Sequence, residues 1–133
     1  MTPNTRRTLL HLMEHPDSDY PTIAEATGLR RTEVTGALHV LRADGLASSR
    51  SDGPREIWAL THMGMSEART LSDCMEAVAL LLARGPQSME DVARLTGFPD
   101  AEVRTALKAL REDGRARADG RASSRSAVWE AVE

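Results

Sequence analysis

An internal repeat constrains the fold of this chain more than any other feature. When residues 23–46 are shifted by 69 positions they align with residues 92–115, and 11 of the 24 aligned residues are identical. A period near 70 is longer than the roughly 20–50 residues of solenoid repeats. The repeat therefore predicts two copies of one compact domain, in residues 1–64 and 65–133.

The first part of each copy carries the pattern of two helices. Apolar residues at i, i+3 and i+4 predict an amphipathic first helix over 9–13 in the first copy and 78–82 in the second. Short second helices are expected over 22–27 and 89–96, with Asp19 or Tyr20 preceding the first and Pro21 in its opening turn. An S-x-x-D capping signal at 88–91 precedes the latter.

A glycine, Gly28 or Gly97, closes each second helix, because a positive φ costs least at glycine. A third helix begins three to four residues later and ends at an Asp-Gly pair, 44–45 or 113–114. Helix, short glycine turn and helix is the helix-turn-helix layout. The apolar stripes of the third helices are Val34, Ala37, Leu38 and Leu41 in the first copy, and Val103, Ala106, Leu107 and Leu110 in the second.

A β-hairpin is expected after each third helix. In the first copy strands 46–50 and 56–60 flank a turn at 51–55, which contains the strong turn pair Asp-Gly. In the second copy strands 116–118 and 126–132 flank 119–121. The fold class is therefore mainly α with small β-hairpin wings (α+β), as two tandem winged helix-turn-helix domains. The residues expected to point inward on the returning strands are Ile57, Leu60, Val128 and Val132.

Two tryptophans, Trp58 and Trp129, occupy equivalent positions on the returning strands. Each ring is expected to cover the open end of a small core. The alternative is that the pair forms a contact between the two copies.

The repeated string resembles bacterial winged-helix transcription regulators of the multiple-antibiotic-resistance-repressor and isocitrate-lyase-regulator types. Its residues are Ile-Ala-Glu-Ala-Thr-Gly-Leu at 23–29 and Leu-Arg-Ala-Asp-Gly-Leu at 41–46. Both copies show the resemblance, and together they span nearly the whole chain. It implies a third helix in the DNA major groove and a wing near the minor groove or backbone. The second copy departs from the pattern, with Pro-Asp-Ala at 99–101 in place of Arg-Arg-Thr at 30–32, and Arg115 in place of Leu46.

The outward face of the first copy's third helix follows from 100° per residue. With the apolar stripe inward, Thr32, Gly36, His39 and Ala43 point outward, and they are flanked by Arg31, Thr35 and Arg42. Thr32 would cap the helix or contact phosphate, and Gly36 would allow close approach to DNA or pack on another helix. Arginine binds guanine or phosphate. The candidate DNA-binding residues are Arg30, Arg31, Thr32, Thr35, His39, Arg50, Arg55, Arg104, Lys108, Arg117, Arg121 and Arg125.

The two wings differ in charge. The second has four arginines, at 115, 117, 121 and 125, against Asp119, a local charge of +3, whereas the first is neutral. The short Ser and Ala side chains around the arginines of the second wing would let these arginines enter a narrow DNA groove. The alternative is that the tip of this hairpin is simply solvated. On the third helix of the second copy, Arg104 and Lys108 are one turn apart and would share a run of phosphates, unless this is a solvated face of mixed charge.

Composition excludes several function classes. A net charge of −3 excludes a uniformly basic nucleic-acid coat, and four aromatic residues are too few for single-strand stacking platforms. The single cysteine, Cys74, excludes an internal disulfide and a multi-cysteine zinc site, and makes a reducing cytoplasm the expected location. Apolar runs fall short of the roughly 20 residues of a membrane span, so we expect no membrane partner.

Catalytic and metal-binding motifs are absent from the sequence. It has no phosphate-binding glycine loop, nucleophile elbow or paired-carboxylate motif, so we expect no enzymatic activity and no cofactor. His11 and His15 have the i, i+4 spacing that binds metals, but only Asp17 lies near them, and we expect no metal. Cys74, near the start of an apolar helix, is expected to be buried rather than reactive.

The leading hypothesis is a sequence-specific, double-stranded-DNA-binding transcriptional regulator built of two winged-helix modules. One alternative is a protein–protein interaction module, as a complex subunit or scaffold, which the acidic balance and the second copy's third helix favour. Another is a plasmid or phage replication or partition DNA-binding protein. Duplex binding that falls steeply with salt would separate the DNA-binding hypotheses from the interaction module.

The segment 61–72 joins the copies, and its only strong helix breaker is Gly64, so the next helix is expected to begin at Ser66 or Ser72. Two modules in one chain would act as a built-in pseudo-dimer on two half-sites. Alternatively, a homodimer would form through the apolar residues Met63, Met65, Leu71 and Met75.

Overall fold

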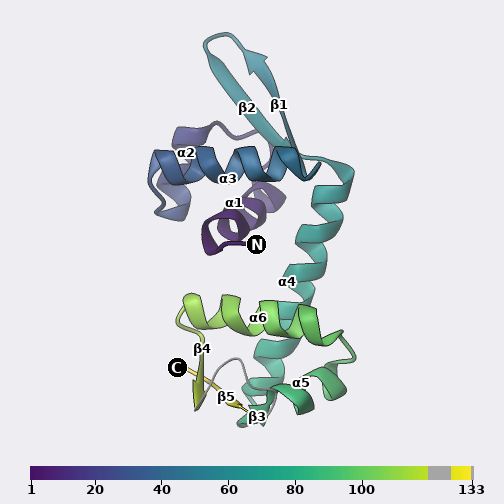
Figure 1. Cartoon of the computed structure of the whole chain (residues 1–133). Helices are drawn as coiled ribbons and strands as arrows, with labels where there is room; N and C mark the ends of the chain where they lie inside the picture. Colours follow the sequence, from purple (N-terminus) through teal and green to yellow (C-terminus); the bar gives the residue numbers. More distant parts are fainter. Residues whose placement is uncertain (120–126, 133) are drawn as a thin grey trace. The chain divides into compact units, whose positions relative to one another are not determined.

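The chain forms two compact units, Met1–Arg69 and Thr70–Glu133, in a computed structural model that describes residues 1–119 and 127–132 (Figure 1). The candidate residues Arg121 and Arg125 lie outside the described residues. Within 1–119 and 127–132, no helix is long and apolar enough to cross a membrane.

Unit 1 contains three helices followed by a hairpin. The helices are α1 (Pro3–Glu14), α2 (Tyr20–Thr27) and α3 (Arg31–Ala43), and the strands are β1 (Ala47–Asp52) and β2 (Arg55–Leu60). In Figure 1 the hairpin projects away from these helices. The predicted order of elements is therefore confirmed in this unit.

The second helix of unit 1 begins two residues before the expected Thr22, with Asp19 preceding it and Pro21 in its first turn as predicted. The carboxylate of Asp19 accepts a hydrogen bond from the backbone N–H of Thr22, at 3.1 Å, and so caps the helix. As a result α2 starts at Tyr20 rather than at Thr22. It ends as expected, at Gly28 with a φ of 75°.

The core of unit 1 is built on the predicted stripe of α3. Val34, Leu38 and Leu41 are at most 1% exposed and belong to one cluster with side chains of α1, α2 and β2. Burying each such side chain contributes about 1.5–3 kcal/mol. Trp58 is only 3% exposed and lies in the same cluster, so its predicted place in the core is confirmed.

The hairpin turn of unit 1 is tighter than predicted. The antiparallel register runs from Ala47 opposite Leu60 to Asp52 opposite Arg55, so only Gly53 and Pro54 connect the strands. Asp52 is therefore a paired strand residue, and the expected turn over 51–55 is wrong. Gly53 has a φ of 62°, and proline fixes φ near −65° at the next position, which fits a type II′ turn.

A short pairing that the sequence pattern did not reveal completes each sheet. In unit 1, Ser18 and Trp58 exchange backbone hydrogen bonds of 3.1 and 2.8 Å. In unit 2, strand β3 (Gln87–Ser88) pairs with β5 (Val128–Ala131) in the same way. Ser18 and Gln87 are 69 positions apart, the same shift as in the repeat.

Unit 2 repeats the arrangement with α5 (Met89–Thr96), α6 (Asp100–Glu112) and β4 (Ala116–Asp119). Its strand order is β3-β5-β4. The hydroxyl of Ser88 accepts from the backbone N–H of Asp91 at 3.1 Å, which confirms the capping signal. The predicted stripe of α6 is also buried, with Val103, Ala106, Leu107 and Leu110 at most 1% exposed.

The returning strand of unit 2 has the opposite phase from the one predicted. Val128 and Val132 are 39% and 40% exposed, so the expectation that they point inward is wrong. Trp129, at 1% exposed, and Ala127 face the core instead. Because side chains alternate along a strand, burying the large indole forces Val128 to the other face.

Helix α4 (His62–Leu82) is continuous through the segment in which a break was expected. Its start is fixed by the hydroxyl of Thr61, which accepts from the backbone N–H of Gly64 at 3.0 Å. A Cβ at residue 64 would lie 1.8 Å from the carbonyl oxygen of Leu46. Glycine is needed there for close backbone approach rather than for a helix break, and the expected starts at Ser66 and Ser72 are wrong.

The apolar residues proposed for a homodimer differ in accessibility along α4. Met63 is 59% exposed, whereas Met75 is 7% exposed. Cys74 is also buried, at 1% exposed, and lies in the second half of α4 rather than near a helix start. Met75 is therefore not available to a second copy.

Candidate nucleic-acid interface

The outward face of α3 has the composition that its helical spacing predicted. Thr32, Thr35, Gly36, His39 and Ala43 are all exposed, opposite the buried stripe. Apart from the imidazole of His39, these side chains are short, so the backbone of α3 is accessible on this face.

The start of α3 is organised around Glu33. Its Oε1 accepts the backbone N–H of Arg30 at 2.9 Å, and its Oε2 accepts the Asn4 side-chain amide at 3.0 Å. The Arg30 N–H is the main cause, and Asn4 a smaller one, of a lowered pKa for Glu33. Arg30 is thus the N-cap residue, and the expectation that Thr32 caps the helix is wrong.

Two arginines flank this helix start with exposed guanidinium groups, those of Arg30 and Arg31. The Arg31 guanidinium lies over the ring of Tyr20, 5.9 Å from its centroid. In the part of the chain that the structure describes, neither arginine takes part in an ion pair. Their positive charge therefore faces solvent uncompensated by a direct carboxylate contact.

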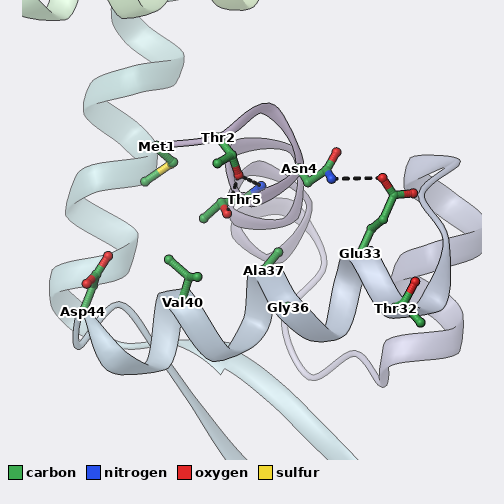
Figure 2. A pocket seen from close by; sticks show the side chains of 10 residues that line it. All are labelled: Met1, Thr2, Asn4, Thr5, Thr32, Glu33, Gly36, Ala37, Val40 and Asp44. Carbon is green, nitrogen blue, oxygen red and sulfur yellow. Dashed lines mark hydrogen bonds between the residues drawn. The ribbon is translucent and has the colours of Figure 1, made fainter.

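An open groove of about 710 Å³ runs between the N-terminal end of α1 and one side of α3 (Figure 2). Gly36 and Val40 line it on α3, and the Asn4–Glu33 hydrogen bond crosses it. A Cβ at Gly36 would meet no atom within 4 Å, so packing of Gly36 on another helix is wrong for the described structure. No Lys or Arg side chain lines the groove, which makes it unsuited to anions.

The exposed end of α3 meets the wing through three side chains. The Arg42 guanidinium lies over the Trp58 ring, 5.0 Å from its centroid, and Arg42 Nη2 is 2.8 Å from Nδ1 of His39. The His39 ring is edge-on to Trp58, at 6.3 Å between centroids. Sequence reasoning had placed Arg42 only beside the outward face, because helical spacing gives no signal for a contact with β2.

The wing arginines of unit 1 are engaged by carboxylates. Arg50 pairs with Asp17 at 3.4 Å, and Arg55 pairs with Asp19 at 3.5 Å and with Asp52 at 3.4 Å. The pKa of Asp19 is lowered, first by the hydroxyl and N–H of Thr22 and less by Arg55. The wing arginines therefore pair with Asp17 and Asp19 of the loop before α2, and only Asp52 among the acids counted for the wing takes part.

Unit 2 presents a different helix face. Arg104 and Lys108 are exposed and one turn apart on α6, but Asp100 and Glu102 occupy its first turn. The contact between helix and wing recurs, with Arg111 5.9 Å from the centroid of Trp129.

The described part of the second wing contains an ion pair between Arg117 and Glu130. Glu130 was not counted in the expected local charge of +3; with it, the four arginines and two acids of this wing sum to +2. Two of those arginines, Arg121 and Arg125, lie outside the described residues.

The remaining candidate chemistry is weak. The rings of His11 and His15 lie 4.9 Å apart, and the pKa of His11 is lowered, first by burial and then by His15. Residues 1–119 and 127–132 contain no group of three side chains suited to a metal ion. The Cys74 thiol donates to the carbonyl of Glu102 at 3.6 Å, and burial raises its pKa to about 11, so it is a poor nucleophile at neutral pH.

No protein-family model and no curated protein matches this chain. Solved structures do match. ZitR from Lactococcus lactis is 24% identical with a TM-score of 0.58, covering 85% of this chain and 83% of its own. FabT from Streptococcus pneumoniae, solved in complex with DNA, is 21% identical with a TM-score of 0.58, covering 85% and 77%. The PcaV transcriptional regulator from Streptomyces coelicolor is 22% identical with a TM-score of 0.52, covering 86% and 74%.

These structural neighbours are MarR-family winged-helix transcription regulators. At such identities the likeness concerns the fold: a mainly helical protein with a small antiparallel β-hairpin wing. The resemblance to the multiple-antibiotic-resistance-repressor type is confirmed at this level.

Proposed function

We propose that this chain is a sequence-specific, double-stranded-DNA-binding transcriptional regulator built of two winged-helix modules, one in each compact unit. The observation that carries the proposal is the start of α3 in unit 1. There two exposed arginines, Arg30 and Arg31, have no ion-pair partner among the described residues and adjoin a helix face of short side chains. FabT, a neighbour in fold, was solved in complex with DNA, which supports the same partner.

In this proposal the two units have different tasks. Unit 1 reads bases with the turn and start of α3, through Arg30, Arg31, Thr32, Thr35 and His39. Unit 2 contributes phosphate contacts through Arg104 and Lys108, which point outward one turn apart. Phosphate contacts orient a protein on the duplex, and base contacts supply the sequence preference.

The test is duplex binding by the full chain, measured by fluorescence anisotropy over a range of salt concentrations. The duplex is first selected from random DNA with the unaltered protein. Replacement of Arg30 and Arg31 by alanine should weaken binding by about fivefold or more, since one base contact is worth roughly 1–3 kcal/mol. The control replaces two other exposed arginines, Arg69 and Arg84, and makes the same change in net charge.

A result in which both double variants bind equally well would refute the assignment to α3. If the unaltered protein binds no duplex even at low salt, the DNA-binding function itself is wrong. In that case a protein-interaction module is the second candidate, and a specific observation favours it. The helix α6 begins with Asp100, where α3 begins with Arg31, while the next acid, Glu33 or Glu102, is common to both.

A further inference from the structure

We propose that Arg42 is a specificity-determining positioning residue, which holds His39 in the tautomer that offers an N–H to a hydrogen-bond acceptor on a DNA base. This inference rests on the proposed function of α3. It assigns Arg42 a role other than phosphate binding, and it assigns the class of base atom that His39 recognises.

The tautomer follows from the chemistry of the two side chains. A guanidinium group has only hydrogen-bond donors, so in the 2.8 Å contact Arg42 Nη2 donates and His39 Nδ1 accepts. A neutral imidazole carries one proton, and with Nδ1 accepting, that proton is on Nε2. The Nε2–H is therefore the group that His39 presents on the side of the ring away from Arg42.

Arg42 is itself held in place from the core. Its guanidinium lies 5.0 Å from the centroid of Trp58, within the range of a cation–π interaction. Trp58 is 3% exposed, and its backbone is paired with Ser18. A buried ring thus orients the arginine, and the arginine orients the histidine, in the way that outer partners orient the histidines of metal sites.

The exposed place of His39 on α3 identifies what its N–H can recognise. In the major groove the acceptors are N7 and O6 of guanine, N7 of adenine and O4 of thymine, whereas cytosine presents an amino donor. We therefore expect His39 to favour an acceptor-bearing base at one position of the bound site.

The second copy supplies an internal comparison. The arginine and tryptophan recur there, with Arg111 5.9 Å from the centroid of Trp129. Position 39 corresponds to Lys108. The ammonium group of lysine has only hydrogen-bond donors, so it cannot accept a hydrogen bond from an arginine. The contact between helix and wing is thus common to both units, and its use to orient a base-reading histidine is specific to unit 1.

The first experiment concerns the protein without DNA. Nitrogen-15 NMR of the full chain, at a pH where the imidazole is neutral, should show His39 with a protonated Nε2 and an unprotonated Nδ1. The Arg42→Met variant keeps an apolar chain over Trp58 and removes the donor, so His39 should become a mixture of tautomers. The spectrum of His39→Ala assigns the signal. A protonated Nδ1 in the unaltered protein would overturn the proposal even if DNA binding is intact.

The second experiment measures base preference by selecting bound duplexes from random DNA. His39→Ala should abolish the preference at one base position, and Arg42→Met should relax it roughly fivefold at that same position, the lower end expected for one base contact. The double variant should be no worse than His39→Ala. The dependence of affinity on salt should be unchanged in Arg42→Met.

If Arg42→Met weakens binding to all DNA sequences equally and reduces the salt slope by about 0.9, then Arg42 is a phosphate ligand and the proposal is overturned. Failure of the unaltered protein to bind any duplex would instead refute the proposed function, and base reading by His39 with it. The NMR result on the free protein distinguishes that case, because it reports the tautomer alone.

Discussion

Two glycines of unit 1 serve different physical purposes, although neither requires a positive φ. Gly64 lies where the backbone of α4 passes the carbonyl of Leu46, so close that a Cβ would be 1.8 Å from that oxygen. Gly36 lies in the middle of α3, where a Cβ would meet nothing within 4 Å. The first is fixed by the fold, and the second is left free for the helix surface.

We predict opposite effects on stability from the same substitution at these glycines. Gly64→Ala should destabilise the protein by roughly 1–3 kcal/mol, because backbone must move to admit the methyl group. Gly36→Ala should stabilise it by about 0.5–1 kcal/mol, through the higher helix propensity of alanine. Urea unfolding of the two variants measures both free energies, and an unchanged midpoint for Gly64→Ala would contradict the close contact.

At the scale of elements, the loop before α2 and the wing of unit 1 are electrostatically linked. Asp17 and Asp19 flank Ser18, whose backbone pairs with Trp58, and their carboxylates contact Arg50 and Arg55. The corresponding positions of the second copy are Pro86 and Ser88, which carry no charge. The first wing must give up these ion pairs before its arginines can bind phosphate.

We predict that Asp17→Asn with Asp19→Asn raises duplex affinity and steepens the salt dependence by up to about 0.9, the value for one arginine, because Arg50 is released whereas Arg55 keeps its ion pair with Asp52. The folded structure should tolerate both changes. Asparagine adopts the positive φ of 61° found at Asp17, and it caps helices as well as aspartate does at position 19. The exposed pair of Arg50 with Asp17 contributes less than about 1 kcal/mol, and Arg55 keeps its exposed pair with Asp52, so little stability should be lost.

The control for this prediction removes the arginines first. In a background of Arg50→Gln and Arg55→Gln, the two asparagine replacements should change the affinity little. An equal gain of affinity in both backgrounds would show that net charge alone, rather than release of the wing arginines, is responsible.

Periodicity predicted the parts of the fold that depend on long apolar patterns. The stripes of α3 and α6 and the glycine ends of their preceding helices could be found, because burial and positive φ restrict residue type strongly. The two-residue strand β3 and the Ser18 bridge could not, because so short a pairing places no pattern on the side chains. The phase of β5 was missed because two valines suggested one face while a single tryptophan occupies the other.

The candidate site also has features that the sequence predicted and features that it did not. The outward residues of α3 followed from 100° per residue, a rule that concerns one helix alone. The contacts of Arg42 with Trp58 and of Arg50 with Asp17 join different elements, and no spacing along the sequence encodes such distances. What the chain does with its charges thus depends on contacts that only the folded structure reveals.

On the scale of the whole molecule, the two units share their core pattern and differ at the surface. The buried stripe, the capping glycines and the arginine over tryptophan recur in both units. The helix start is Arg-Arg-Thr at 30–32 in the first copy and Pro-Asp-Ala at 99–101 in the second, and the position of His39 is occupied by Lys108. The two copies therefore agree at the positions that fold each unit and differ at the positions proposed to contact DNA.

The paired tryptophans have a practical consequence. The chain contains two tryptophans, one buried in each unit, so Trp129→Phe and Trp58→Phe each leave a single intrinsic fluorophore that reports the unfolding of one unit. When Gly64→Ala is added, the emission of Trp58 should shift to longer wavelength at lower urea, while the transition of Trp129 stays in place. Equal shifts of both would mean that the units melt as one cooperative block. The internal repeat thus gives the molecule its own pair of label-free optical reporters.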